Sequence, residues 1–221
     1  MNKTNSARPS LEEVWHQVPP DYYQKGTEKN ILQKIWHTAK LHAVLELIKK
    51  TGNTPKRILD VGCASGWFLS NIAGQYPKAQ CTGIDVYKDA IEYGKRKYKN
   101  LHLHHHDGHK LPFRDGSFDL IICTEVLEHV VDPDKVLQEI KRVLARDGIA
   151  IVEMDTGNLL FRLVWYWWTH IRNGVWKDAH IQTFNTKRLE AMISDAGFSI
   201  TEKKLFTLNM AVAFLLGKNN K

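Results

Sequence analysis

The sequence contains few cysteines and lacks a long hydrophobic run. Its three cysteines, Cys63, Cys81 and Cys123, are an odd number without metal-site spacing, which argues against a disulfide framework and fits a reducing cytoplasm. The longest nearly apolar stretch, residues 159–168, includes Arg162 and is much shorter than the about 20 residues of a membrane-spanning helix. Because the N-terminus also lacks an apolar signal stretch, we expect a cytoplasmic protein without a spanning helix.

Acidic residues are fewer than basic ones. The 221 residues include 31 Lys and Arg and 24 Asp and Glu, which gives a formal net charge of +7. Such a balance favours nucleic acid or anionic lipid as a partner. However, the charges are scattered, with one dense cluster at 95–99, and no helix-turn-helix, zinc-finger or RNA-binding signature accompanies them. We therefore interpret the charge mainly as a solvated surface and expect no nucleic-acid partner.

The hydrophobic pattern predicts an α/β fold. A helical pattern begins at Thr27, the expected N-cap, and stops at Gly52. Beyond it, short apolar runs alternate with helical segments, which predicts a parallel sheet with helices on both faces. The expected strands are 57–61, 79–85, 101–106, 118–123 and 149–154, and the helices between them are 68–73, 87–98 and 133–145.

The remaining segments complete a Rossmann-like, mostly parallel seven-stranded sheet. A helix at 186–196 and closing strands at 198–206 and 210–216 follow an aromatic insertion. Because neither repeats nor low-complexity linkers interrupt the chain, we expect residues 1–221 to form one domain. Its expected parts are an N-terminal helical cap (1–52), a cofactor-binding core (55–155), an aromatic lid insertion (156–183) and the C-terminal helix and strands (184–221).

A glycine-containing loop, residues 62–66, follows the first expected strand, at the edge where open α/β sheets bind ligands. Gly62 and Gly66 allow the backbone to approach a ligand. The G-x-G-x-x-G fingerprint is absent, because Ala64 and Trp67 occupy its second and third glycine positions, and the sequence has no phosphate-binding P-loop motif. This pattern disfavours a pyrophosphate cofactor and leaves a nucleoside without phosphates.

Three aspartates at expected strand ends support a nucleoside. Asp85 ends the second strand, about 20 residues after the loop, where a carboxylate can accept hydrogen bonds from ribose hydroxyls. Asp107 ends the third strand and can accept from an exocyclic amine, or form a turn with Gly108. Asp60 can contact a ligand ammonium or order the loop. Together the three carboxylates predict a site for a cationic nucleoside.

These features belong to a longer series of motifs: Leu59–Phe68, Gly83–Asp85, His106–Asp107, Leu111–Asp119 and Glu125–Val130. In this order and spacing, they resemble the type 11 branch of the class I S-adenosylmethionine-dependent methyltransferases over about residues 55–155. Residues 178–198 also resemble that branch.

The resemblance implies roles for individual residues. Asp60, Gly62 and Gly66 would line the methionine part of S-adenosylmethionine, Asp85 would hold its ribose, and Asp107 would contact its adenine. The turn Cys123–Glu125 would flank the sulfonium. Ala64 departs from the family, which often has glycine there. The expected cofactor-binding residues are Asp60, Gly62, Ala64, Gly66, Asp85, Val86, Asp107, Gly108 and Thr124.

Three residues are candidates for a general base, which would remove a proton from the acceptor. His129 follows the fourth strand, Asp155 ends the fifth, and His180 follows the insertion. Each has an alternative role, since the histidines can order loops and Asp155 can cap a turn. We expect no metal, because the histidine-rich segment 102–109 does not form a regular ligand set.

Residues 158–176 hold four of the seven tryptophans. This segment is either a helix buried against the sheet or at a dimer interface, or a lid that recognises an apolar acceptor or contacts a membrane surface through Arg162 and Arg172. We expect Tyr22, Tyr23, Trp36 and His37 to form the opposite wall of the pocket.

We therefore expect S-adenosylmethionine-dependent methyl transfer to a small or lipid-like acceptor, by in-line attack on the cofactor methyl. The protein would be cytoplasmic or peripheral to the membrane. One alternative is a non-catalytic module that binds the cofactor, and a less favoured one is a nucleic-acid methyltransferase. The acceptor atom and the oligomeric state stay open.

Overall fold

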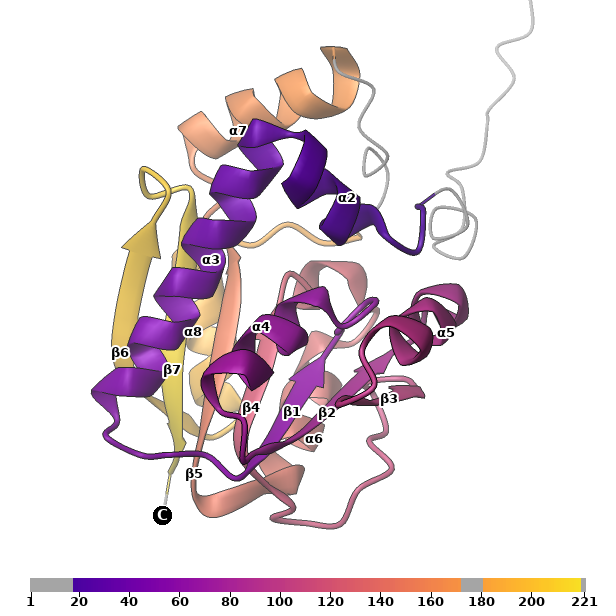
Figure 1. The fold of residues 1–221 in the computed structure, drawn as a ribbon. Coiled ribbons are helices and arrows are strands. Elements are labelled where there is room, and N and C mark those ends of the chain that lie inside the picture. The colour runs from indigo at the N-terminus through magenta and orange to yellow at the C-terminus, as the bar shows by residue number, and fades with distance from the viewer. Residues whose placement is uncertain (1–17, 172–180, 220–221) are drawn as a thin grey trace, which may run out of the picture.

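A computed structural model describes residues 18–171 and 181–219. Its centre is a seven-stranded sheet with the order β3-β2-β1-β4-β5-β7-β6 (Figure 1). Strands β1 to β5 are parallel, and β7 is antiparallel to both of its neighbours, which confirms the predicted mostly parallel sheet. The strands are β1 (Arg57–Val61), β2 (Gln80–Asp85), β3 (His102–His105), β4 (Phe118–Thr124), β5 (Leu144–Asp155), β6 (Phe198–Phe206) and β7 (Ala211–Lys218).

Helices cover both faces of this sheet. Buried side chains of α3, α4 and α5 pack on one face, and those of α6 and α8 pack on the other. None of the described helices is both long and apolar enough to cross a membrane. The helices are α2 (Tyr22–Lys29), α3 (Ile31–Lys50), α4 (Trp67–Gln75), α5 (Lys88–Lys97), the short turn η1 (Leu127–His129), α6 (Pro133–Val143), α7 (Leu159–Tyr166), the π-helical turn η2 (Trp167–Ile171) and α8 (Thr186–Asp195).

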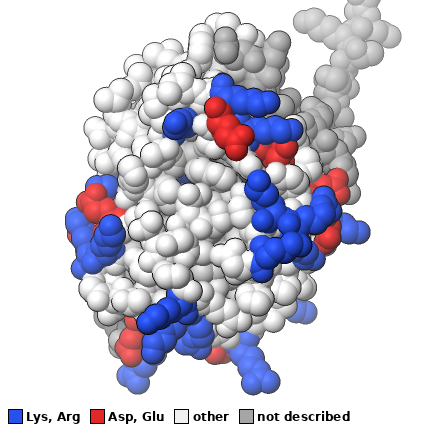
Figure 2. Space-filling view, viewed as in Figure 1, with Lys and Arg blue, Asp and Glu red and all other residues white. Residues whose placement is uncertain are grey.

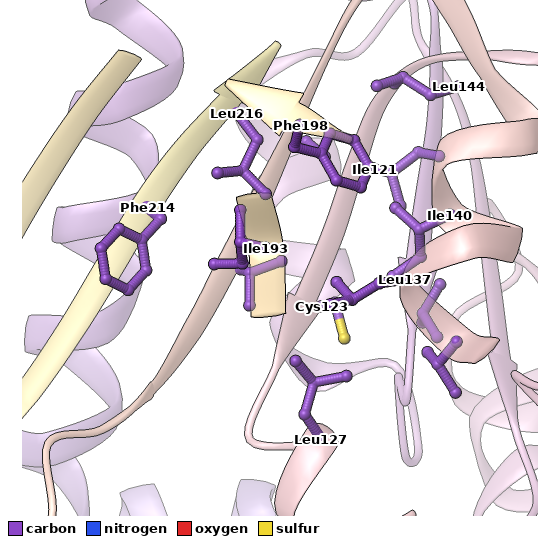
Figure 3. Packing of buried hydrophobic residues seen from close by; sticks show 14 of the residues in the cluster. Ile121, Cys123, Leu127, Leu137, Ile140, Leu144, Ile193, Phe198, Phe214 and Leu216 are labelled. Atoms are coloured by element: carbon purple, nitrogen blue, oxygen red, sulfur yellow. The ribbon is translucent and has the colours of Figure 1, made fainter. Parts of the chain in front are cut away.

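The alternation of side chains along the strands divides the core into two clusters. On β1, Ile58 packs with α3 and α4, whereas Leu59 packs with α6 and α8. Figure 3 shows the second cluster, where Leu137 and Ile140 of α6 lie against the sheet. Both faces of the central strands are therefore buried, as their continuous apolar sequences predict.

The N-terminal helical region differs from the prediction of one helix that begins at Thr27. The helix is broken at Asn30, whose side chain accepts hydrogen bonds from the amides of Leu32 at 3.0 Å and Gln33 at 3.2 Å and so caps α3. Thr27 lies inside α2, where its hydroxyl donates to backbone carbonyls one turn earlier. The predicted N-cap was therefore wrong, while the stop at Gly52, with φ +68°, agrees with the structure.

Strand β5 begins five residues earlier than its predicted start at 149. Leu144 pairs with Phe118, and after a register shift Ile149 pairs with Leu120. The intervening polar residues and Gly148 lack a strand-like alternation, which is why the sequence pattern extended α6 to 145 instead. The C-terminal end of β5, at Asp155, lies where the prediction places it within one residue.

Candidate functional site

A cavity of about 580 Å³ opens where β1, β2 and β4 end. This volume lies within the range of about 300–1,000 Å³ that is typical of small-molecule sites. The position is the switch point of the sheet, since the chain leaves β1 towards β2 and β3 on one side and later adds β4 and β5 on the other. Of the predicted cofactor residues, the cavity is lined by Gly62, Ala64, Asp85, Val86, Asp107, Gly108 and Thr124.

The loop after β1 forms one wall of the cavity by adopting left-handed backbone conformations. Gly62 has φ +79°, and Ala64 has φ +46°, which alanine rarely adopts. The amide of Ala64 donates a hydrogen bond of 2.8 Å to Asp85 Oδ2, which holds the strained residue in place. A Cβ on Gly62 would clash with Val126 Cγ2, so only glycine lets the loop lie this close to the turn after β4.

Asp85 is fixed between two loops at the end of β2. Its Oδ1 accepts from the amide of Tyr87 at 2.7 Å, while its Oδ2 accepts from Ala64. Burial raises the pKa of this carboxyl, and the backbone hydrogen bonds oppose that rise. Each oxygen keeps further acceptor capacity. The side chain can therefore accept hydrogen bonds from a ligand in the cavity without losing its own partners.

Asp107 combines the two roles considered for it. It lines the cavity, and its Oδ1 accepts from the amide of His109 at 2.9 Å and lies 2.6 Å from His109 Nδ1, which closes the turn after β3. Asp60 lies deeper, on the wall of a small adjoining pocket with Lys40, and burial raises its pKa to about 7. Gly66 starts α4 outside both pockets, with leucine side chains of the β3 region against it.

An ion pair that the sequence analysis missed joins α3 to the turn after β4. Lys40 Nζ lies 2.7 Å from Glu125 Oε2, and the indole of Trp36 donates to Glu125 Oε1 at 2.7 Å. Burial alone would raise the pKa of Glu125, but the Lys40 charge and these hydrogen bonds lower it to about 2. Trp36, Lys40 and Val44 follow each other at four-residue spacing. The sequence feature that could have indicated this ion pair is a lysine within an otherwise apolar row, because a buried lysine needs a partner of opposite charge.

Further carboxylates are buried beside this pair. Glu153 of β5 is fully buried, and neither of its oxygens has a hydrogen-bond partner within the described part of the chain. Burial raises the pKa of Glu153 and of Glu128 well above the usual range. The charge of Lys40 opposes the rise at Glu153. Lys40 therefore lies in a cluster of carboxyl groups that is larger than its one hydrogen-bonded partner.

The three candidate bases are not brought together. His129 ends η1 and lines the cavity. Asp155 lies outside the cavity lining, where it accepts a hydrogen bond of 2.9 Å from the amide of Gly157, in the manner of a turn cap. Burial raises the pKa of Asp155 to about 7. His180 lies outside the described residues.

The N-terminal aromatics occupy the wall opposite the glycine loop. Tyr22 and Tyr23 line the cavity, and Tyr23 packs edge-on against His37 of the adjoining pocket, with ring centroids 5.1 Å apart. Trp36, which was expected in the same wall, is not among the residues that line either pocket, and its ring centroid lies 6.2 Å from that of Phe161 of α7. Helix α7 therefore packs against α3, next to the ion pair that Trp36 shares. Trp176, at the end of the aromatic segment, lies outside the described residues.

A family model described as a methyltransferase domain matches residues 33–203. The chain belongs to this family, which confirms the resemblance to the class I, type 11-like S-adenosylmethionine-dependent methyltransferases. The N-acetylserotonin methyltransferase of human, solved in complex with S-adenosylmethionine, has the same fold. Its TM-score is 0.69 at 18% identity, over 96% of this chain and 61% of that one.

Two curated relatives illustrate how widely the acceptors of similar proteins vary. The malonyl-[acyl-carrier protein] O-methyltransferase of Legionella pneumophila is 35% identical over 42% of this chain and 34% of that protein. The demethylmenaquinone methyltransferase of Staphylococcus haemolyticus is 28% identical over 68% of this chain and 63% of that protein. The chain spans about half the length of the curated relatives it matches.

Proposed function

We propose that this protein transfers the methyl group of S-adenosylmethionine to a small, lipid-like acceptor. The observation that carries the proposal is the placement of Asp85. A methyltransferase-family chain holds this carboxylate, already oriented by two backbone amides, at the edge of a cavity of about 580 Å³. The cavity is wide enough for a nucleoside, and Gly62 lets the loop after β1 lie close to the turn after β4.

The residues that line the cavity divide among the parts of the cofactor. Asp85 would accept from the ribose hydroxyls, and Val86, Asp107 and Gly108 would surround the adenine. The loop around Gly62 and Ala64 would hold the methionine part, above the small pocket that contains Asp60. When bound, S-adenosylmethionine supplies an activated methyl group on a sulfonium, so the protein needs no covalent intermediate. Its own residues bind, orient and exclude water.

The environment of the acceptor side supports a lipid-like molecule. Helix α7 starts four residues after β5 ends, and its Phe161 and Trp165 rings stack with centroids 5.7 Å apart. Together with Trp36 they form an aromatic wall next to the turn that carries Glu125. Apolar walls exclude water from a reacting centre and favour an acceptor with apolar surface.

His129 is the candidate base that fits the cavity geometry, since its residue lines the same space as Thr124 and Asp85. We propose that it takes the proton released by the acceptor. Asp155 and His180 remain the alternative candidates. His129→Gln should lower kcat while leaving the affinity for S-adenosylhomocysteine unchanged, and a loss of about 10²-fold or more would fit a general base.

A methyl-transfer assay tests this function. The protein is incubated with S-adenosylmethionine labelled in its methyl group and either a total lipid extract or a pool of water-soluble metabolites. We expect label to move into the organic phase with the lipid extract, and Asp85→Ala to reduce this transfer. Label that appears in the aqueous products alone would contradict the acceptor class. Cofactor binding without transfer to either pool would instead favour the non-catalytic module.

A further inference from the structure

An apolar surface lies at the end of the molecule opposite the C-terminus, where α7 lies beside the N-terminal end of α3 (Figure 1). Most of the large hydrophobic side chains that the structure leaves exposed lie on these two segments, including Leu159 at 71%, Ile31 at 68% and Leu163 at 60%. We define the apical patch as Ile31, Leu32, Ile35, Leu159, Leu160, Leu163, Val164 and Trp167.

Apart from Arg162, helix α7 is apolar on all sides, although only one side is buried. Phe161 faces inward against Trp36 and stacks on Trp165. The exposed residues at 159, 160, 163, 164 and 167 follow the three- and four-residue spacing of a single helix face. A helix that is hydrophobic all round is normally buried completely. The outer face of α7 is therefore suited to contact a second apolar medium.

The charges around the apical patch show which medium fits. Exposed Lys34 and Arg162 lie among its apolar residues, and residues 31–45 and 156–171 contain no aspartate or glutamate. Figure 2 shows an uncharged area over α7, with both basic and acidic side chains beside it. Apolar side chains flanked by lysine and arginine match a bilayer surface, where the former enter the acyl boundary and the latter meet anionic headgroups.

A second copy of the chain is a poorer match for this surface. In a twofold dimer the same patch of each copy faces the other. Lys34 and Arg162 of one copy would then approach those of the other, and no acidic residue of the patch would neutralise them. An anionic lipid surface offers the neutralising charge that a second copy lacks.

We propose that the apical patch docks this protein on anionic lipid bilayers. Docking would place α7, and the cavity at the strand ends below it, beside the lipid phase from which a lipid-like acceptor would enter. The inference thus extends the proposed function. It is tested without cofactor or acceptor, so its failure would leave the methyl-transfer proposal untouched, and a failure of methyl transfer would leave the docking result standing.

Vesicle co-sedimentation tests the docking. The full chain is mixed with phosphatidylcholine vesicles, or with vesicles in which about a third of the lipid is phosphatidylglycerol. We expect binding to the anionic vesicles, which weakens as salt rises from about 0.05 to about 0.5 M, because the headgroup attraction is screened. The double variant Leu159→Ser/Leu163→Ser should lose at least about tenfold in affinity. The control Leu205→Ser, at an exposed residue of β6, should bind like the wild type.

A second pair of variants separates the patch from the net charge. Lys34→Glu/Arg162→Glu should reduce binding by about tenfold or more, whereas Lys78→Glu/Arg146→Glu changes the net charge equally at exposed sites near the amino ends of strands and should reduce it much less. Equal losses in both pairs would overturn the proposal. Unchanged vesicle binding of the Leu159→Ser/Leu163→Ser variant would also overturn it. A third contrary result would be that the wild type does not bind vesicles and is a dimer by light scattering, and that this leucine variant is a monomer.

Discussion

The carboxyl groups at the ends of β2 and of β5 differ in whether they have hydrogen-bond partners. Asp85, at the end of β2, accepts two backbone hydrogen bonds from the loops that it connects. Glu153, near the end of β5, is buried with no hydrogen-bond partner among the described residues, beside the similarly buried Glu128. The proposed cofactor side of the site is thus stabilised by its own loops, whereas the proposed acceptor side contains carboxyl groups that depend on charge from elsewhere.

Lys40 of α3 supplies that charge. It is buried, pairs with Glu125 at 2.7 Å and also lies in the field of Glu153 and Glu128. Burial would lower its pKa, but these carboxylates outweigh that effect and raise it. Helix α3 therefore does more than cover the sheet, because its Lys40 supplies the positive charge beside the buried carboxyl groups. Breaking this arrangement should cost stability that breaking surface pairs does not.

The largest change in stability should follow from the substitution Lys40→Met. This variant leaves Glu125 without its cation in a largely buried place, so we expect the free energy of unfolding to fall by about 3 kcal/mol. Urea denaturation measures the change. Lys50→Met, which breaks the exposed pair with Glu202, should cost less than about 1 kcal/mol. Equal losses in the two variants would show that the buried cluster needs no compensating charge.

The same comparison predicts that the burial of Asp155, at the end of β5, makes the stability of the fold depend on pH. Asp155 has a pKa of about 7 in the folded protein and near 4 when unfolded, so the folded state binds more protons between these values. Its contribution to stability is therefore lost as pH rises from about 4 to about 7. Asp155→Asn should match the wild type at about pH 4 and be more stable by about 1–2 kcal/mol at about pH 8. A difference that does not vary with pH would contradict this.

The smallest change in stability should come from the substitution Glu153→Met. The substitution replaces a buried carboxyl without hydrogen-bond partners by an apolar side chain of similar size, so we expect a gain of about 1 kcal/mol at neutral pH. Thermal unfolding at fixed pH reports the gain. Glu202→Met, at a partly exposed position, should stay within about 0.5 kcal/mol of the wild type. A destabilised Glu153→Met would mean that Glu153, rather than Glu125, is the main partner of Lys40.

These regions also differ in how far the sequence predicts them. The glycine loop, Asp85 and the strand alternation are local patterns, and each was found where the structure has it. The Lys40–Glu125 pair joins residues 85 positions apart, which no local spacing encodes. The break at Asn30 was missed for another reason, since Thr27 and Asn30 are both good capping residues and their neighbours decide between them.

Cofactor binding at the end of β2 is the claim on which the other conclusions depend, and calorimetry tests it most directly. S-adenosylhomocysteine should bind the wild type, and NAD should not bind. Asp85→Ala should weaken the binding of S-adenosylhomocysteine by about 1–3 kcal/mol, because the ribose hydroxyls lose a charged acceptor. An Asp85→Ala variant that binds as tightly as the wild type, or a wild type that binds NAD, would contradict the assignment of this site.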